Sequence, residues 1–204
     1  MSKRITTVLI AIGTMTLATA AQSAESAEQP LVESGAEWSY FTGPTPLPPE
    51  WKVEPAKFLT LGTGQAPLGF NYPDIKTNLP YGDDAENKFP IAYFASEFEW
   101  DASLAQPGQE AITIGLSCDD GCIAYVNGEE VHRLRLPAGT PPAYSAQPVS
   151  KDVEFYSAAV PLSILKEGKN TVAVELHQQH PRSSDLRFSA KITPANPKNA
   201  EESP

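Results

Sequence analysis

The sequence predicts an all-β protein, built as an antiparallel two-sheet jelly-roll sandwich with long Pro-rich loops. Apolar and polar residues alternate in many short runs, which is typical of strands with one face on a core. Turn residues separate these runs at short intervals. No stretch carries a long helical pattern, and the 204 residues include 20 prolines, which favour irregular connections.

The pattern is clearest between Ala111 and Leu136. Residues 111–117 alternate, the turn residues Asp119-Asp120-Gly121 follow, and residues 122–126 form a second expected strand. Asn127-Gly128 is the strongest short hairpin signal that a sequence offers, and residues 131–136 return as a third strand. The stretch therefore predicts two hairpins end to end.

Four further strands are expected outside this stretch, with one helical turn at residues 162–166. The strands are expected at residues 91–100, 155–160, 171–177 and 185–192. Pro-rich segments at residues 38–51, 59–89 and 137–152 are expected to be irregular connections. The predicted sandwich domain spans residues 37–193.

Both ends of the chain are expected to lie outside the sandwich. Residues 1–23 have a basic start, an apolar run and small residues before a cleavage site, as in a signal peptide. This predicts a secreted or periplasmic protein without membrane insertion, and no Cys near the cleavage site could accept a lipid. Residues 24–36 are expected to be a flexible lead, and residues 194–204 a disordered tail.

The charge of the chain argues against two classes of partner. The formal net charge is −10, and removal of residues 1–23 leaves 13 basic and 25 acidic residues. Nucleic acids and anionic membrane surfaces both require a basic footprint. We therefore expect no nucleic-acid partner and no anionic lipid surface as a partner.

Cys118 and Cys122 are the only cysteines, and in an exported chain they predict a disulfide across the first hairpin. The closed loop is short, so the loop-entropy model predicts about 2 kcal/mol of stabilisation. The bond would fix the shape of the Asp119-Asp120-Gly121 turn. A redox-active pair is the alternative.

An acidic turn gives one candidate metal site, and no cofactor is required by any motif. Calcium prefers oxygen ligands, and these cluster in Asp83, Asp84, Glu86 and Asn87. The spacing matches no EF-hand, and an ordinary acidic turn is the alternative.

Several runs resemble a known family when they are taken together. They are DDGCIAYVNGEEVHRLRLPAG at residues 119–139, PLSILKEGKNTVAVELHQ at 161–178, SSDLRF at 183–188, APLGF at 66–70 and NKFPIAYF at 87–94. In this order they resemble the galactose-binding-like jelly-roll domain of secreted bacterial proteins, which is similar to the sugar-binding sandwich domain of glycoside hydrolases. The resemblance implies the sandwich fold. This fold hosts sugar binding, protein contacts and structural roles alike.

These observations predict a non-catalytic recognition module whose partner is a glycan or, alternatively, an exported protein in an assembly. Sugar sites combine aromatic faces with planar amides and carboxylates, and loop aromatics such as Trp51, Tyr72 and Tyr81 fit that need. The candidate ligand-binding residues are Asp119, Asp120, Tyr144, Glu175, His177, Gln178 and Arg182. A small hydrolase that uses His177 with Asp185 is a further alternative, although the common hydrolase motifs are missing.

Overall fold

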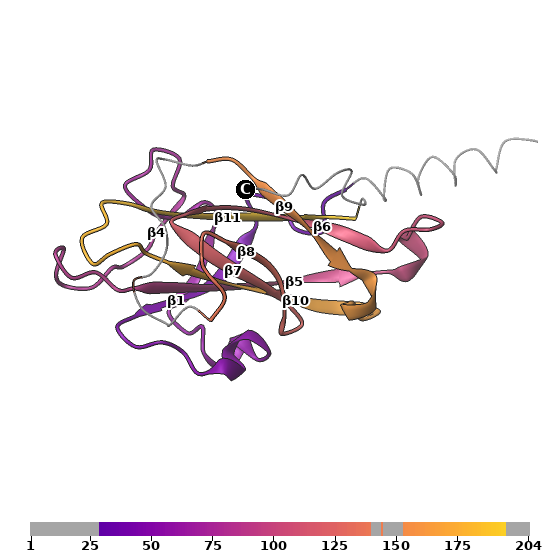
Figure 1. The fold of residues 1–204 in the computed structure, drawn as a ribbon, viewed down its shortest axis with the longest axis horizontal. Coiled ribbons are helices and arrows are strands. Elements are labelled where there is room, and N and C mark those ends of the chain that lie inside the picture. Colours follow the sequence, from indigo (N-terminus) through magenta and orange to yellow (C-terminus); the bar gives the residue numbers. More distant parts are fainter. Residues whose placement is uncertain (1–28, 140–143, 145–152, 195–204) are drawn as a thin grey trace, which may run out of the picture.

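The computed structural model describes residues 29–139, 144 and 153–194, and these residues confirm the predicted two-sheet sandwich (Figure 1). The expected signal peptide at residues 1–23 lies outside the described residues, as do residues 24–28 and 195–204. The predicted strands at residues 91–192 are all present, with ends within three residues of the expected ones.

One layer is an antiparallel sheet of six strands. In spatial order these are β2 (Gly62–Gln65), β1 (Glu37–Gly43), β5 (Ile91–Trp100), β10 (Gly168–His177), β7 (Gly121–Val126) and β8 (Glu129–Leu134). β5 and β10 share ten register pairs and lie in the middle of this sheet.

The other layer is a five-stranded sheet. Its order is β4 (Thr77–Asn78), β3 (Leu68–Phe70), β11 (Leu186–Thr193), β6 (Ala111–Asp119) and β9 (Tyr156–Pro161). Only the short β3–β4 pair is parallel among the described strands. Four 3₁₀ turns complete the elements: η1 (Pro49–Lys52), η2 (Pro55–Lys57), η3 (Ala102–Leu104) and η4 (Leu162–Ile164).

The main core lies between the two sheets, because alternate residues of each strand are apolar and point inward. Phe94 of β5 stacks on Phe188 of β11 with ring centroids 4.1 Å apart, and Trp38 of β1 meets Phe188 edge-on. Ile114 and Val174 are fully buried in the same cluster. These aromatic contacts join the centres of the two sheets.

A second apolar layer covers part of the outer face of the six-stranded sheet. The segment that carries η1 and η2 lies on this outer side (Figure 1). Trp51 is buried there, and its ring contacts Tyr93 at 4.8 Å and Tyr125 at 6.1 Å between centroids. The outer face is therefore divided into a covered part and an open part.

The prediction of a hairpin at Asp119-Asp120-Gly121 is wrong. β6 pairs with β11 and β9, whereas β7 pairs with β10 and β8, so the turn carries the chain from one sheet to the other. Alternation alone cannot distinguish such an arch from a hairpin, because both join two strands with a short turn. The Asn127-Gly128 hairpin is confirmed, with positive φ angles of 52° and 90° that suit a type I′ turn.

Three segments are more ordered than the sequence indicates. The expected irregular connection at residues 38–51 begins with β1, which spans Glu37–Gly43. The expected irregular connection at residues 59–89 contains the short strands β2, β3 and β4. Within residues 24–36, Leu31 and Val32 both donate backbone hydrogen bonds to the carbonyl of Ile192 in β11. This part of the N-terminal lead is therefore attached to the five-stranded sheet.

Candidate functional site

The fold brings the sequence motifs together at one rim of the sandwich. Gly121 at the start of β7 is the register partner of His177 at the end of β10. The backbone N–H of Gln179 donates to Asp120 Oδ2 at 2.7 Å. The turn after β6 and the end of β10 thus share a rim, as their strand directions require.

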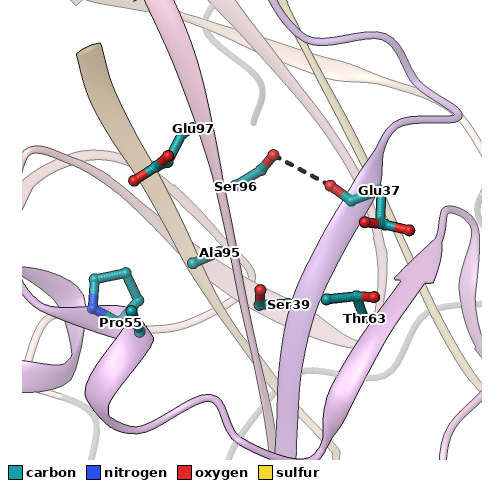
Figure 2. Close-up of a pocket in the computed structure, with 8 residues that line it drawn as sticks. Glu37, Ser39, Pro55, Thr63, Ala95, Ser96 and Glu97 are labelled. Atoms are coloured by element: carbon teal, nitrogen blue, oxygen red, sulfur yellow. Dashed lines mark hydrogen bonds between the residues drawn. The ribbon is translucent and has the colours of Figure 1, made fainter.

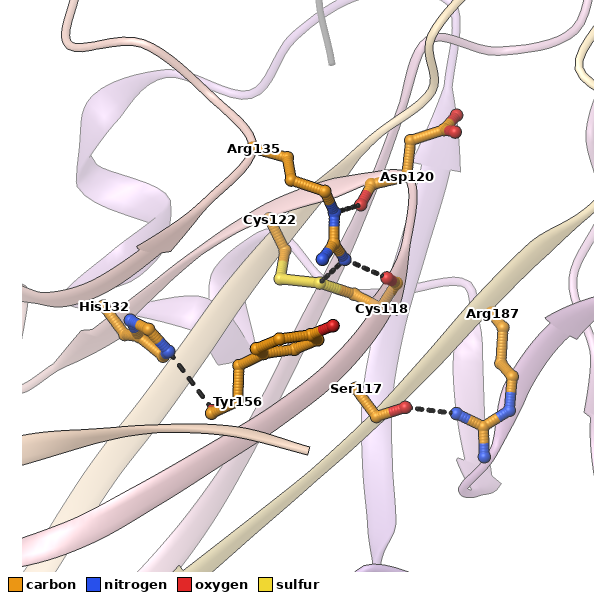
Figure 3. Close-up of a disulfide and its surroundings, with 8 residues drawn as sticks. All are labelled: Ser117, Cys118, Asp120, Cys122, His132, Arg135, Tyr156 and Arg187. Atoms are coloured by element: carbon orange, nitrogen blue, oxygen red, sulfur yellow. Dashed lines mark hydrogen bonds between the residues drawn. A yellow bond between two sulfur atoms is a disulfide. The ribbon is translucent and has the colours of Figure 1, made fainter. Parts of the chain in front are cut away.

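The predicted disulfide between Cys118 and Cys122 is confirmed, but it joins the two sheets and not the arms of a hairpin. The Cα atoms are 6.5 Å apart, a span that disulfides accept. Figure 3 shows Arg135 beside the bond, where its guanidinium donates to the carbonyls of Cys118 and Asp120. The arch is therefore held by a covalent bond and by one arginine.

Asp119 is the first residue of the arch, and its side chain is buried. Its Oδ2 accepts a hydrogen bond from the Tyr72 hydroxyl at 2.7 Å. Burial raises the pKa of Asp119 to about 7, the Tyr72 hydrogen bond acts against this rise, and the nearby charges of Asp120 and Asp185 add to it. The group titrates near neutral pH, yet its contacts are with the protein itself.

A buried arginine secures the neighbouring part of the rim. Arg187 of β11 is 5% exposed, and its guanidinium donates from Nε and Nη2 to the Asp74 carboxylate, at 2.8 Å for the Nη2–Oδ2 pair. A third donor reaches Ser117 Oγ at 2.6 Å. Hydrogen bonds from Arg187 lower the pKa of Asp74. This pair ties the loop after β3 to the five-stranded sheet.

His177 and Gln178 are also buried in the scaffold, each at 2% exposure. The Gln178 side chain donates to the Phe89 carbonyl at 3.0 Å, and its N–H donates to Pro90. His177 has no hydrogen-bond partner for either ring nitrogen among the described residues. The His-Gln motif thus anchors the end of β10 to the lead into β5.

The remaining candidate ligand-binding residues lie apart from one another. Glu175 is on the outer face of β10, where it accepts a hydrogen bond from the Tyr125 hydroxyl at 2.9 Å and lies 3.7 Å from His177 Nε2. Arg182 is 72% exposed and pairs with Glu86 at 3.1 Å. Tyr144 is half-buried, and burial raises its pKa.

The acidic turn with the candidate calcium ligands is exposed. Asp84 Oδ1 accepts the N–H of Glu86 at 2.9 Å, while the Glu86 carboxylate pairs with Arg182. Asp83 and Asn87 extend the same turn. Asp84 therefore bonds within the turn and Glu86 bonds outside it, and no three His, Cys, Asp or Glu side chains of the described chain gather into a metal-holding group. The calcium site stays a prediction.

An open pocket of about 440 Å³ lies on the outer face of the six-stranded sheet (Figure 2). It is lined by Glu37, Ser39, Pro55, Ala56, Thr63, Ala95, Ser96 and Glu97. Strands β1, β2 and β5 provide its floor, and η2 borders it through Pro55. Small-ligand pockets are typically about 300–1,000 Å³, so this pocket has room for a small molecule or a sugar ring.

The pocket forms because a row of small side chains crosses three strands. Thr63, Ser39 and Ala95 are register partners on β2, β1 and β5. The next row on the same face holds Phe41 and Tyr93, whose rings belong to the apolar layer. The step from large to small side chains leaves a hollow at the edge of that layer.

The lining of the pocket can bind a polyhydroxylated ligand. Ser39 and Thr63 offer hydroxyl groups, and Glu37 and Glu97 offer carboxylates at the wall. Ser96 Oγ donates to the Glu37 carbonyl at 3.1 Å, which fixes one side of the pocket. Pro55, Ala56 and Ala95 add apolar surface, and no aromatic side chain is among the lining residues.

Loops and motifs do not reveal this pocket, because most of its lining residues lie on strands of the six-stranded sheet. One signal was present: Ala95 and Glu97 occupy outward positions in the alternating strand at residues 91–100. Their partners on β1 and β2 are far away in sequence, and only the sheet register brings them together.

No family model matches the sequence, and no curated protein matches it significantly. Among solved structures, the chain is similar to a β-glucuronidase from Bifidobacterium dentium complexed with coumarin-3-O-glucuronide, with TM-score 0.46 and 14% identity over 72% of this chain and 20% of that one. A β-glucuronidase from an uncultured Clostridium sp. gives TM-score 0.47 and 12% identity, over 82% and 29% of the two chains. A β-glycosidase from Bacteroides vulgatus gives 0.48 and 11%, over 80% and 20%.

The chain thus spans less than a third of each of these glycosidases. A likeness of this size carries no functional conclusion, and the function is argued below from the chain's own residues. No helix of the described residues is long and apolar enough to cross a bilayer.

Proposed function

We propose that this chain is a secreted or periplasmic, non-catalytic carbohydrate-binding module, and that its sugar site is the pocket of Glu37, Ser39, Thr63, Ala95 and Glu97. The observation that carries the proposal is the lining of this pocket. It sets hydroxyls and carboxylates around a floor of small side chains on a rigid sheet. Sugar hydroxyls require such donors and acceptors at fixed positions.

The chemistry of the rim supports a role without catalysis. Ser183 and Ser184 are directed toward Asp185, at 3.5 Å from its carbonyl and 3.1 Å from its carboxylate, and neither bonds to His177. A nucleophile and its base must lie within hydrogen-bond reach. The rim groups hold the fold, whereas the pocket presents polar groups that a ligand can reach.

The disulfide supports a location outside the cytoplasm, because such bonds persist in oxidising compartments. It fits the expected signal peptide at residues 1–23. Detection of the mature protein in periplasmic or culture fractions, starting after residue 23, tests this part of the proposal. An unprocessed cytoplasmic protein contradicts it.

A glycan panel tests the sugar site, run once with calcium and once with a chelator. We expect binding of at least one oligosaccharide class. The variant Thr63→Trp fills the pocket from an exposed position on the edge strand β2 and should weaken that binding at least tenfold. Thr60→Trp, an exposed position outside the pocket lining, is the matched control and should bind as the native protein does.

No binding of any glycan in either condition contradicts the proposal. Binding that survives Thr63→Trp places the site elsewhere. Co-purification of a protein partner that Thr63→Trp releases favours the alternative of an exported assembly.

A further inference from the structure

A second cavity adjoins the pocket and extends it into a groove. This cavity has a volume of about 620 Å³ and shares Glu37, Ser96 and Glu97 with the first. Its other lining residues are Leu31, Val32, Glu33, Gly35, Ala36 and Gln65. The groove therefore runs from η2 across the edge of the six-stranded sheet to the segment before β1, which is longer than one sugar ring requires.

The far wall of the groove is firmly attached. Leu31 donates its N–H to the Ile192 carbonyl at 2.8 Å, and Ser189 Oγ donates to the Ser34 carbonyl at 2.7 Å. The N–H of Ala66 donates to the Ala36 carbonyl at 3.0 Å. Hydrogen bonds to β11 and to the residue that follows β2 hold this segment in place, so the groove is a preformed feature of the fold.

The charged side chains that line the groove are all negative. Three carboxylates line it, and neither Glu33 nor Glu37 has a basic partner within the part of the chain that the structure describes. Glu97 pairs with Lys169 at 2.7 Å, but both side chains are more than half exposed, so the pair is weak and exchangeable. No Lys, Arg or His is among the lining residues of either cavity.

We propose that this groove selects oligosaccharides that carry free amino groups, such as chains of glucosamine units. The inference rests on the proposed sugar site and adds its ligand class. An ammonium group on a sugar forms a charge-assisted hydrogen bond with a carboxylate, whereas a uronic acid is repelled by Glu33 and Glu37. A net charge of −10 for the whole chain acts in the same direction.

The groove suits a sugar chain better than a basic peptide. Its floor presents the hydroxyls of Ser39 and Thr63 on neighbouring strands, beside the carboxylates of Glu37 and Glu97, which suits the hydroxyls and amino groups of a sugar chain. Peptide sites instead anchor a few large side chains in apolar pockets. The largest apolar residue that lines this groove is Leu31, in the second cavity.

The test is calorimetry with four tetrasaccharides at about pH 5.5, above the ordinary pKa of glutamate. The probes are β-1,4-linked glucosamine, its N-acetylated form, cellotetraose and a galacturonate tetramer, with tetralysine as the peptide probe. We expect the glucosamine tetramer to bind at least tenfold more tightly than the others, because its ammonium groups can pair with more than one of the three carboxylates and each exposed pair contributes about two- to fivefold. Added salt should reduce this preference.

Glu37→Gln should reduce the preference for the amino sugar about two- to fivefold. Glu99→Gln removes one negative charge from the outer face of β5, outside both cavities, and should leave the preference unchanged. Equal or tighter binding of cellotetraose or the galacturonate tetramer overturns the inference and leaves the sugar site intact. Equal binding of tetralysine also overturns it. If no saccharide binds here or on the glycan panel, the proposed function itself fails.

Discussion

The rim and the outer-face groove of this sandwich differ in whether their polar side chains are buried or exposed. At the rim, Asp119, Asp120 and Arg187 are buried, and their polar groups bond to the protein itself. In the groove, Glu37 and Thr63 are exposed around small side chains and face solvent. The rim carries the recognisable motifs, yet the groove has the accessible chemistry. A polar sequence motif can therefore mark a structural joint and not a binding site.

The largest expected effect tests whether the rim is structural. Asp74→Ala leaves the buried Arg187 guanidinium without its carboxylate, so the free energy of unfolding should fall by about 3 kcal/mol. Urea denaturation measures this change. Asp83→Ala in the exposed acidic turn is the control and should change stability by less than about 0.5 kcal/mol. Equal, small effects of both variants would remove the argument that the rim holds the fold.

Loss of the disulfide is the second effect in size. The double variant Cys118→Ser, Cys122→Ser should lose about 2 kcal/mol from the free energy of unfolding, because the unfolded chain regains the entropy of a short closed loop. Thermal unfolding of the oxidised native protein and the variant gives the difference. Glycan binding should be unchanged, since the bond is absent from the groove lining. Loss of binding in a folded variant would link the two regions.

The pH dependence of stability gives a third effect. In the folded protein, burial raises the pKa of Asp119 to about 7, whereas the unfolded value is about 4. The folded state holds this proton more tightly, so its contribution to stability is fully present below about pH 4 and is lost as pH rises towards 7. Asp119→Asn stays neutral, so its stability relative to the native protein should increase as pH rises from about 4 to about 7.

Melting curves at several pH values measure that difference. Asp83→Asn is the control, and its difference from the native protein should stay constant with pH because the side chain is exposed. A constant difference for Asp119→Asn as well would mean that Asp119 is ionised throughout the range.

The smallest expected effect is on glycan binding, and it compares one serine of the pocket with one serine of the rim. Ser39→Ala removes one hydroxyl from the pocket floor and should weaken glycan binding about threefold, as expected for one hydrogen bond. Ser184→Ala removes a hydroxyl from the rim and should leave binding unchanged. Stability should change little in either variant, because both positions are near the surface. Weaker binding by Ser184→Ala than by Ser39→Ala would indicate that the binding site lies at the rim.

Local patterns predicted the strands from β5 onward, but they did not predict β1 to β4 or the partners of any strand outside the Asn127-Gly128 hairpin. The alternation at residues 91–100 and the Asn127-Gly128 turn are short-range signals, and both elements are as expected. The arch at Asp119-Asp120-Gly121 was mistaken for a hairpin because the choice of sheet depends on long-range pairing with β10 and β11.

The candidate site was harder to predict than the fold for the same reason. The pairing of Asp74 with Arg187 spans 113 positions, and the row of Thr63, Ser39 and Ala95 exists only through sheet register. Polarity identified Asp119, Asp120, His177 and Gln178 as candidates, but polarity does not reveal burial. A polar motif has to be placed in the fold before it can be given a role.

Residue-level mapping of a bound sugar tests the central claim most directly. Backbone amide NMR spectra of the native protein should be recorded during titration with the glucosamine tetramer, or with cellotetraose if that binds more tightly. We expect saturable shifts at Glu37, Ser39, Thr63 and Glu97, with the amides of Asp119, Gly121 and Gln179 unchanged. Shifts confined to those three rim residues would contradict the account and return the binding site to the motif-bearing rim.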